Sequence, residues 1–257
     1  MFTLVGYYDA TSHSALAAID AIADPHLRVS GDDIYVPSWN KLMGVYAGGY
    51  NMTACRLQSP SLRRLSNQRV SPVFYGAGVS TLPPNLWYRD VLQDDHLHPR
   101  TLDIAEALNA YGINGGATAE WVLVWLMDKI EALPGGEIFC TEGTVTVTGV
   151  TASWVNGAIT FTQTLPAGRY ALVGMRGEDA AVVAYRCVFP DISVRPGIIG
   201  ASSIATPDLP LFRNGRLGSW GEFEHDSPPS LDILCNADGS VTPEIYMDLI
   251  QVRAGRR

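Results

Sequence analysis

The second half of the chain alternates apolar and polar positions with a period of two. Residues 143–175 are rich in Val, Thr, Ile, Phe and Tyr, and Asn156-Gly157 lies between two such runs. This alternation predicts half-buried strands, and Asn-Gly is the strongest short signal for a hairpin turn. Residues 167–170 supply another turn and residues 180–189 another strand. Strands about every 8 to 12 residues with turns between them predict a sandwich or a barrel.

The first half departs from this pattern at two places. Residues 12–24 carry apolar side chains at a spacing closer to that of a helix than of a strand, and Ser14 can cap a helix there. Residues 101–112 begin at Thr101, a good capping residue, and end at Gly112, which is typical of a helix end. We therefore predict two short helices in loops between strands.

One segment of the chain recurs 130 positions later. Residues 41–60 and 171–190 align without a gap and are identical at five positions: Leu42/Leu172, Gly44/Gly174, Ala54/Ala184, Arg56/Arg186 and Pro60/Pro190. Weaker similarities follow in the same order, at offsets between 120 and 130: 34–37 with 163–166, 69–73 with 193–197, 81–89 with 208–213, 98–104 with 227–233, and 120–128 with 243–252. We interpret this order as an internal duplication.

The duplication predicts two domains, residues 1–133 and 134–257, because a proline and two glycines interrupt the chain at residues 131–137. Each copy of about 110 to 130 residues fits eight short strands in two facing sheets. The predicted fold class is all-β, with two tandem eight-stranded jelly-roll sandwiches and short helices in loops. An immunoglobulin-like sandwich is the alternative that strand spacing alone leaves open.

The repeated arginines Arg56 and Arg186 each precede a proline that forms a turn after a strand. We expect both side chains to reach the polar face of a sheet or a contact between the two sandwiches. An ordinary exposed arginine is an equally good interpretation of either position.

The composition is that of a globular chain, with 47% hydrophobic and 17% charged residues. The longest apolar run, residues 121–127, is shorter than the roughly 20 residues of a membrane-spanning helix. Residues 1–10 lack the basic and apolar regions of a secretory signal, so we expect none. The net charge of −8 argues against nucleic-acid binding, and we expect no direct sequence-specific contact with nucleic acid.

Common catalytic and nucleotide-binding motifs, such as GxSxG, HExxH, the P-loop and GxGxxG, do not occur in the sequence. Four cysteines lie far apart and predict small buried apolar side chains rather than zinc ligands: Cys55, Cys140, Cys187 and Cys235. We therefore predict no enzyme activity, no cofactor, and no catalytic, cofactor-binding or metal-binding residue.

Two local clusters still deserve comparison with known chemistry. The segment Asp94–His98 contains two carboxylates and two imidazoles, but one contiguous loop lacks the ligands from elsewhere that complete a metal site. We favour a solvated loop there, and metal binding stays an open question. Glu222 and Glu224 alternate along one predicted strand beside Trp220 and Phe223. That arrangement keeps a jelly-roll carbohydrate-binding or glycoside-hydrolase protein as an alternative.

Two consecutive sandwiches of this size resemble the double jelly-roll major capsid proteins of icosahedral, often membrane-containing, DNA viruses and bacteriophages, the lineage that includes adenovirus hexon. The resemblance covers the whole chain in architecture and is carried by paired strands: "CRLQSP" with "YRCVFP", and "TLDI" with "SLDI". The family has no signature motif that the sequence could match.

The resemblance implies a structural protein of the virion, made in the host cytoplasm, whose homotrimers form pseudo-hexameric capsomers. Its partners would be further copies of itself within and between capsomers, and other virion proteins. It also raises contact of the basic residues 253–257 with an internal membrane or a neighbouring capsomer. A minor capsid, spike or decoration protein of a virion is a further alternative.

Overall fold

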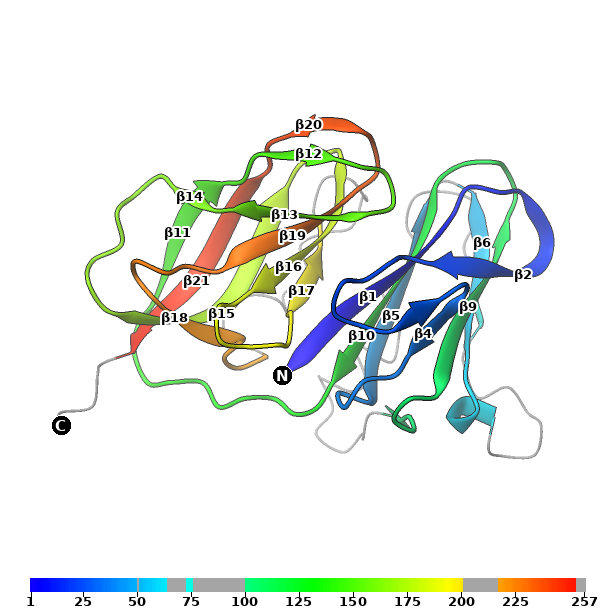
Figure 1. Cartoon of the computed structure of the whole chain (residues 1–257), viewed down its shortest axis with the longest axis horizontal. Coiled ribbons are helices and arrows are strands. Elements are labelled where there is room, and N and C mark those ends of the chain that lie inside the picture. The colour runs from blue at the N-terminus through cyan, green and yellow to red at the C-terminus, as the bar shows by residue number, and fades with distance from the viewer. Residues whose placement is uncertain (50, 64–72, 76–99, 201–216, 253–257) are drawn as a thin grey trace. The chain divides into compact units, whose positions relative to one another are not determined.

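The computed structural model describes residues 1–49, 51–63, 73–75, 100–200 and 217–252 (Figure 1). Within these residues the regular elements are strands, apart from one short 3-10 helix, η1 (Ser61–Arg63). The chain divides into two compact units, which we call the N-terminal unit (residues 4–128) and the C-terminal unit (residues 1–3 and 129–257). Within the described residues, no helix is long and apolar enough to cross a membrane.

The C-terminal unit contains two main sheets. The first has the order β14 (Thr160–Phe161), β11 (Ile138–Thr144), β21 (Glu244–Val252), β15 (Arg169–Glu178) and β18 (Gly221–Glu224). The second has the order β13 (Trp154–Ala158), β19 (Ser230–Cys235), β16 (Val182–Val188) and β17 (Gly197–Ile199). A small ribbon pairs β12 (Val147–Gly149) with β20 (Gly239–Val241). The predicted strand at residues 180–189 is thereby confirmed as β16.

The order of the C-terminal sheets is that of a jelly roll. If β11, β13, β15, β16, β17, β18, β19 and β21 are counted from one to eight, one sheet runs 1-8-3-6 and the other runs 2-7-4-5. The last strand, β21, therefore pairs antiparallel with both the first strand and the third. This arrangement of eight strands in two sheets is the jelly-roll fold.

The N-terminal unit has ten strands in its described residues. They are β1 (Phe2–Asp9), β2 (His13–Ala21), β3 (Val29–Ser30), β4 (Asp33–Tyr35), β5 (Lys41–Gly49), β6 (Met52–Gln58), β7 (Val73–Tyr75), β8 (Arg100–Thr101), β9 (Ala107–Asn114) and β10 (Glu120–Met127). One layer has the order β1-β10-β5-β8. In the other, β9 pairs with β6 and, on its opposite edge, with β2 and β4, while β6 also pairs with β7.

The N-terminal unit thus repeats the order of the C-terminal unit. Counted without the added hairpin β3–β4, its strands again run 1-8-3-6 and 2-7-4-5. Its two layers are continuous at one edge, because Tyr7 and Tyr8 at the end of β1 pair with Ala21 and Asp20 of β2. The fold class predicted from the sequence is confirmed as all-β with jelly-roll strand order.

Irregularities in the strand pairing recur at the same spacing as the sequence repeat. Met43 is the extra residue of a bulge between β5 and β10, and Val173 is the extra residue between β15 and β21. Thr53 is bulged between β6 and β9, and Val183 between β16 and β19. Both pairs of bulges are 130 positions apart. Because bulges shift register and bend strands at defined places, the ungapped alignment of the two segments matches equivalent positions of the two folds.

Two later similarities in the sequence do not mark equivalent positions. Residues 101–104 begin at the last residue of the short strand β8 and continue beyond it, whereas residues 230–233 lie within β19, whose counterpart is β9. In the last strand, the similarity pairs Met127-Asp128 with Met247-Asp248, 120 positions apart, but the residues opposite Leu42 and Leu172 are Leu126 and Leu249, which are 123 positions apart. Loops of different length between the strands account for the change in offset.

The two predicted helices are wrong. Residues 13–21 form β2, because β1 and β9 supply backbone partners on its two edges: Ala21 lies opposite Tyr7, and Ile19 lies opposite Ala110. Residues 107–114 form β9, in which every second residue is buried. That alternation is hidden in the sequence because Gly112 and Asn114 occupy buried positions usually held by larger apolar residues. Tertiary pairing overrides local propensity in both segments.

The predicted hairpin turn at Asn156-Gly157 is also wrong, since both residues lie inside β13. Asn156 uses its side chain within the sheet, as described below. Gly157 is needed for close packing: a Cβ added there would lie 2.5 Å from a methyl carbon of Val145 and 2.6 Å from one of Val147. Both residues thus serve contacts between strands, which a turn signal read from adjacent residues cannot reveal.

The apolar run of residues 121–127 belongs to β10, which is buried along its whole length. Val122, Val124 and Leu126 join the core of the N-terminal unit, and Trp125 on the alternate face is also buried. A strand buried on both faces needs no alternation of polar residues, which explains the continuous apolar run.

Because the two units have equivalent positions, truncating the same buried side chain in each unit should cost a similar amount of stability. Leu42 and Leu172 are both fully buried at the same position of their folds, so Leu42→Ala and Leu172→Ala should each lower the free energy of unfolding by about 2–5 kcal/mol. Urea unfolding followed by tryptophan fluorescence measures the loss. Ile104→Ala is the control, since Ile104 is 63% exposed and should change little. A negligible loss at either leucine contradicts the assignment of these positions to two cores.

Candidate functional site

The two repeated arginines are buried, so the interpretation of exposed arginines is wrong. Arg56 on β6 is 7% exposed and Arg186 on β16 is 1% exposed. Each guanidinium lies over an aromatic ring: the Cζ of Arg186 is 3.8 Å from the ring centroid of Trp154, and that of Arg56 is 4.8 Å from the ring centroid of Tyr111. Cation–π contacts of this kind are strengthened when water is excluded.

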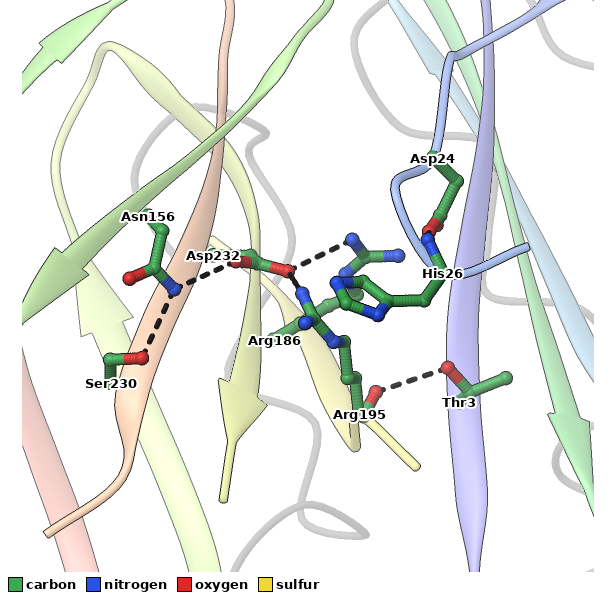
Figure 2. A network of polar contacts seen from close by, with 8 residues as sticks. All are labelled: Thr3, Asp24, His26, Asn156, Arg186, Arg195, Ser230 and Asp232. Carbon is green, nitrogen blue, oxygen red and sulfur yellow. Dashed lines mark hydrogen bonds and ion pairs between the residues drawn. The ribbon is translucent and has the colours of Figure 1, made fainter. Parts of the chain in front are cut away.

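In the C-terminal unit, the buried carboxylate of Asp232 connects three neighbouring strands, one of which carries Arg186 (Figure 2). Asp232 lies on β19 opposite Arg186 of β16 and opposite Asn156 of β13. One carboxylate oxygen, Oδ2, accepts a hydrogen bond from Nη2 of Arg186 at 3.0 Å and another from Nη1 of Arg195. The other oxygen, Oδ1, accepts from Nδ2 of Asn156 at 2.9 Å, and this amide also reaches Oγ of Ser230 at 3.0 Å.

We call Arg186, Arg195, Asp232, Asn156 and Trp154 the arginine–aspartate cluster. The strand register creates it, because residues directly opposite each other on neighbouring strands are close enough for their side chains to touch. Asp232 is 3% exposed and the side chain of Arg195 11%. Removing one partner of a buried ion pair strongly destabilises the protein, because the remaining charge is left without compensation. The cluster therefore ties β13, β19 and β16 into one register.

The N-terminal unit also has an arginine at the equivalent position, Arg56, but the residues around it differ. Tyr111 of β9 lies opposite Arg56, where the C-terminal unit has Asp232. Nη2 of Arg56 donates to Oε1 of Gln58 at 3.3 Å. The shared feature of both units is a guanidinium buried against an aromatic ring, which is an arrangement for packing and register rather than for catalysis.

The carboxylates considered for a sugar site are paired with an arginine. Glu222 Oε2 lies 2.6 Å from Nε of Arg169, and Glu224 Oε1 lies 3.9 Å from Nη1 of the same arginine. Phe223, which lies between them in β18, is 4% exposed, and Trp220, which precedes the strand, is fully buried. Strand alternation places the two carboxylates and the Phe223 ring on opposite faces of the sheet. This geometry does not form the aromatic-lined pair of carboxylates that glycoside hydrolysis requires.

The described residues offer no metal centre of ordinary composition. The segment Asp94–His98 lies outside the described residues, and among those described no three His, Cys, Asp or Glu side chains come together. Cys55, Cys187 and Cys235 are buried free thiols as expected, but Cys140 is exposed, contrary to the prediction. Burial raises the pKa of Cys55 to about 12, which disfavours the thiolate needed for nucleophilic attack or metal binding.

A groove of about 860 Å³ lies in the C-terminal unit, where β11 begins and β21 ends. Its described lining consists of Pro134, Gly135, Gly136, Glu137, Phe139, Gln251 and Val252. Glu137 is the one titratable side chain in that lining. A single carboxylate without a second acid, a base or a nucleophile gives this groove no evident catalytic chemistry.

The arginine–aspartate cluster predicts that neutralising a buried carboxylate lowers the free energy of unfolding much more than neutralising a surface carboxylate. Asp232→Asn should lower the free energy of unfolding by about 3–5 kcal/mol, because two guanidinium groups lose their shared counter-charge. Glu222→Gln should cost at most about 1 kcal/mol, because its pair with Arg169 is partly exposed to solvent. Chemical unfolding of both variants compares the two costs. Equal losses would contradict the structural role of Asp232.

Comparison with known proteins gives few similarities. No protein-family model matches the chain, and no curated protein matches it. Solved structures similar to it include the major capsid protein of bacteriophage PM2, at 11% identity over 100% of both chains with a TM-score of 0.21. They also include the major capsid protein of STIV, at 9% identity over 98% of this chain and 97% of the other, again with a TM-score of 0.21. The fold assignment here rests on the strand order.

Proposed function

We propose that the chain is the structural major capsid protein of an icosahedral virus, assembled as homotrimers that form pseudo-hexameric capsomers. The observation that carries this proposal is the repetition of one jelly roll in one chain, with the same strand order and with bulges 130 positions apart. A chain with two equivalent sandwiches gives six similar building blocks in a trimer. Six similar blocks approximate a hexagon, and hexagons tile a shell with few kinds of contact.

The described polar interior supports a structural role rather than enzyme activity. Its best-formed cluster, around Asp232, joins neighbouring strands and presents no activated nucleophile or acid–base pair. The carboxylates Glu222 and Glu224 are paired with Arg169 rather than with a second acid. These contacts favour a protein whose charged side chains hold neighbouring strands together.

The proposal extends to the partners and the location of the protein. The subunit contacts copies of itself within the trimer and between capsomers, as well as other virion proteins. It is made in the cytoplasm of its host and ends in the virion. Residues 253–257 contain three arginines, which suit contact with anionic headgroups of an internal membrane or with a neighbouring capsomer.

The trimer is testable with the purified full-length chain. Light scattering coupled to size exclusion should give about 83 kDa, three times the chain mass of 27.8 kDa. Negative-stain class averages of that species should show six similar lobes rather than three. A stable monomer at every concentration tested, or a trimer with three lobes, contradicts the proposed capsomer. Hydrolysis of a polysaccharide or specific glycan binding would favour the carbohydrate-active alternative instead.

A further inference from the structure

One end of the N-terminal unit gathers buried polar side chains from several strands. β1 ends there at Asp9 and β9 at Asn114, while β2 begins at His13 and β10 at Glu120. Asp9 is 7% exposed, and both Asn114 and Glu120 are 0% exposed. Buried carboxylates need compensating contacts, because their ionised form loses the stabilisation that water provides. The contacts of Glu120 and Asp9 therefore decide how this end of the unit behaves.

Glu120 holds two turns together through one of its oxygens. Oε1 accepts a hydrogen bond from the backbone N of Asn51 at 2.6 Å and another from Oγ1 of Thr118 at 2.9 Å. Nδ2 of Asn51 donates to the same Thr118 hydroxyl at 2.8 Å. Asn114 adds a hydrogen bond from its Nδ2 to the carbonyl of Thr118 at 3.1 Å, and its Oδ1 accepts from the N of Gly116 at 3.2 Å. The turn between β5 and β6 is thereby tied to the turn between β9 and β10.

The second oxygen of Glu120 is different. Oε2 is buried and has no hydrogen bond of normal geometry among the described residues, although the backbone of Met52 also acts as a weak donor to this carboxylate. The second buried carboxylate, Asp9, accepts from the N of Thr11 at 2.7 Å through Oδ1, and its Oδ2 lies 3.3 Å from Nε2 of His13. At this end β1 contributes Asp9 and β2 contributes His13. The described parts of β5, β6 and β9 contribute no charged side chain there.

We propose that Glu120, with the neighbouring Asp9–His13 pair, is a proton-operated latch for these two turns. With Glu120 ionised, two buried carboxylates share one end of the unit and one oxygen lacks a well-formed hydrogen bond, which loosens the turns. A proton taken from solvent onto Oε2 removes one of the two negative charges. Oε1 can still accept from Asn51 and Thr118, so the turns stay joined at a lower electrostatic cost.

The electrostatics of the site agree with this direction. Burial raises the pKa of Glu120 above its ordinary value, and the charge of Asp9 adds to the increase. Donors from Asn51, Thr118 and Met52 oppose the increase without cancelling it. Because the folded form then binds the proton more readily than the unfolded form, stability rises as the pH falls through the folded-state pKa. The gain is complete below the unfolded-state pKa and is lost as the pH rises again.

Amide hydrogen exchange on the full-length chain tests the latch. After correction for intrinsic rates, the amides of Asn51 and Gly116 should be better protected at about pH 5 than at about pH 7.5. The increase should approach about ten-fold for each unit by which the pKa is raised. In Glu120→Gln, the backbone amides of Asn51 and Gly116 should be well protected at both pH values, because the glutamine side chain keeps the acceptor oxygen and carries no charge. His13→Gln should keep most of the response, and Glu222→Gln should keep all of it.

The proposal is overturned if the wild type shows no such increase, or if Glu120→Gln responds to pH as the wild type does. A carbon-13 titration of the Glu120 carboxyl in the wild type provides a second measurement that needs no variant. A midpoint above that of ordinary glutamates supports the latch, and an ordinary or lower midpoint overturns it. Neither measurement depends on the capsid proposal, because both are made on the dissociated chain.

Discussion

The insertion of the last strand of each unit between the first and the third is the constraint on which the rest of the structure depends. β21 pairs with β11 on one edge and with β15 on the other, and β10 occupies the same place between β1 and β5. Until this strand is in place, the first and third strands have no common partner. Such pairings join residues far apart in the chain, so the chain loses much conformational entropy before the burial of apolar surface compensates for it. The complete burial of β10 shows where that compensation is concentrated.

The same constraint explains which parts of the two units are similar in sequence. The third and fourth strands of each unit carry bulges at Met43 and Thr53, and again at Val173 and Val183. Each bulge sets the register against a strand that arrives much later in the chain, so an insertion between them would move apolar residues to the wrong face. Loops elsewhere have no such restriction. The offset accordingly stays at 130 through this hairpin and changes to 123 in the last strand.

The sequence predicted the structure correctly where adjacent residues alone determine whether a segment forms a strand. The strands expected in the ungapped repeat, which end at residues 55–60 and 185–190, are present as β6 and β16, because their burial leaves its mark on adjacent residues. The helices predicted over residues 12–24 and 101–112 were wrong, since the partners that make these segments strands lie elsewhere in the chain. The arginine–aspartate cluster was missed for the same reason. An aspartate between two apolar residues of a strand, Asp232, was the available signal, but its partner Arg186 is 46 positions away.

The central claim is that one strand order, with its bulges, occurs twice in this chain. Cross-strand nuclear Overhauser effects in an isotopically labelled sample test it most directly. The account predicts that Leu42 lies opposite Leu126 and Leu172 opposite Leu249, with Met43 and Val173 skipped in the pairing. Uninterrupted pairing through either bulge, or a last strand that pairs at the edge of its sheet in one of the two units, would contradict it.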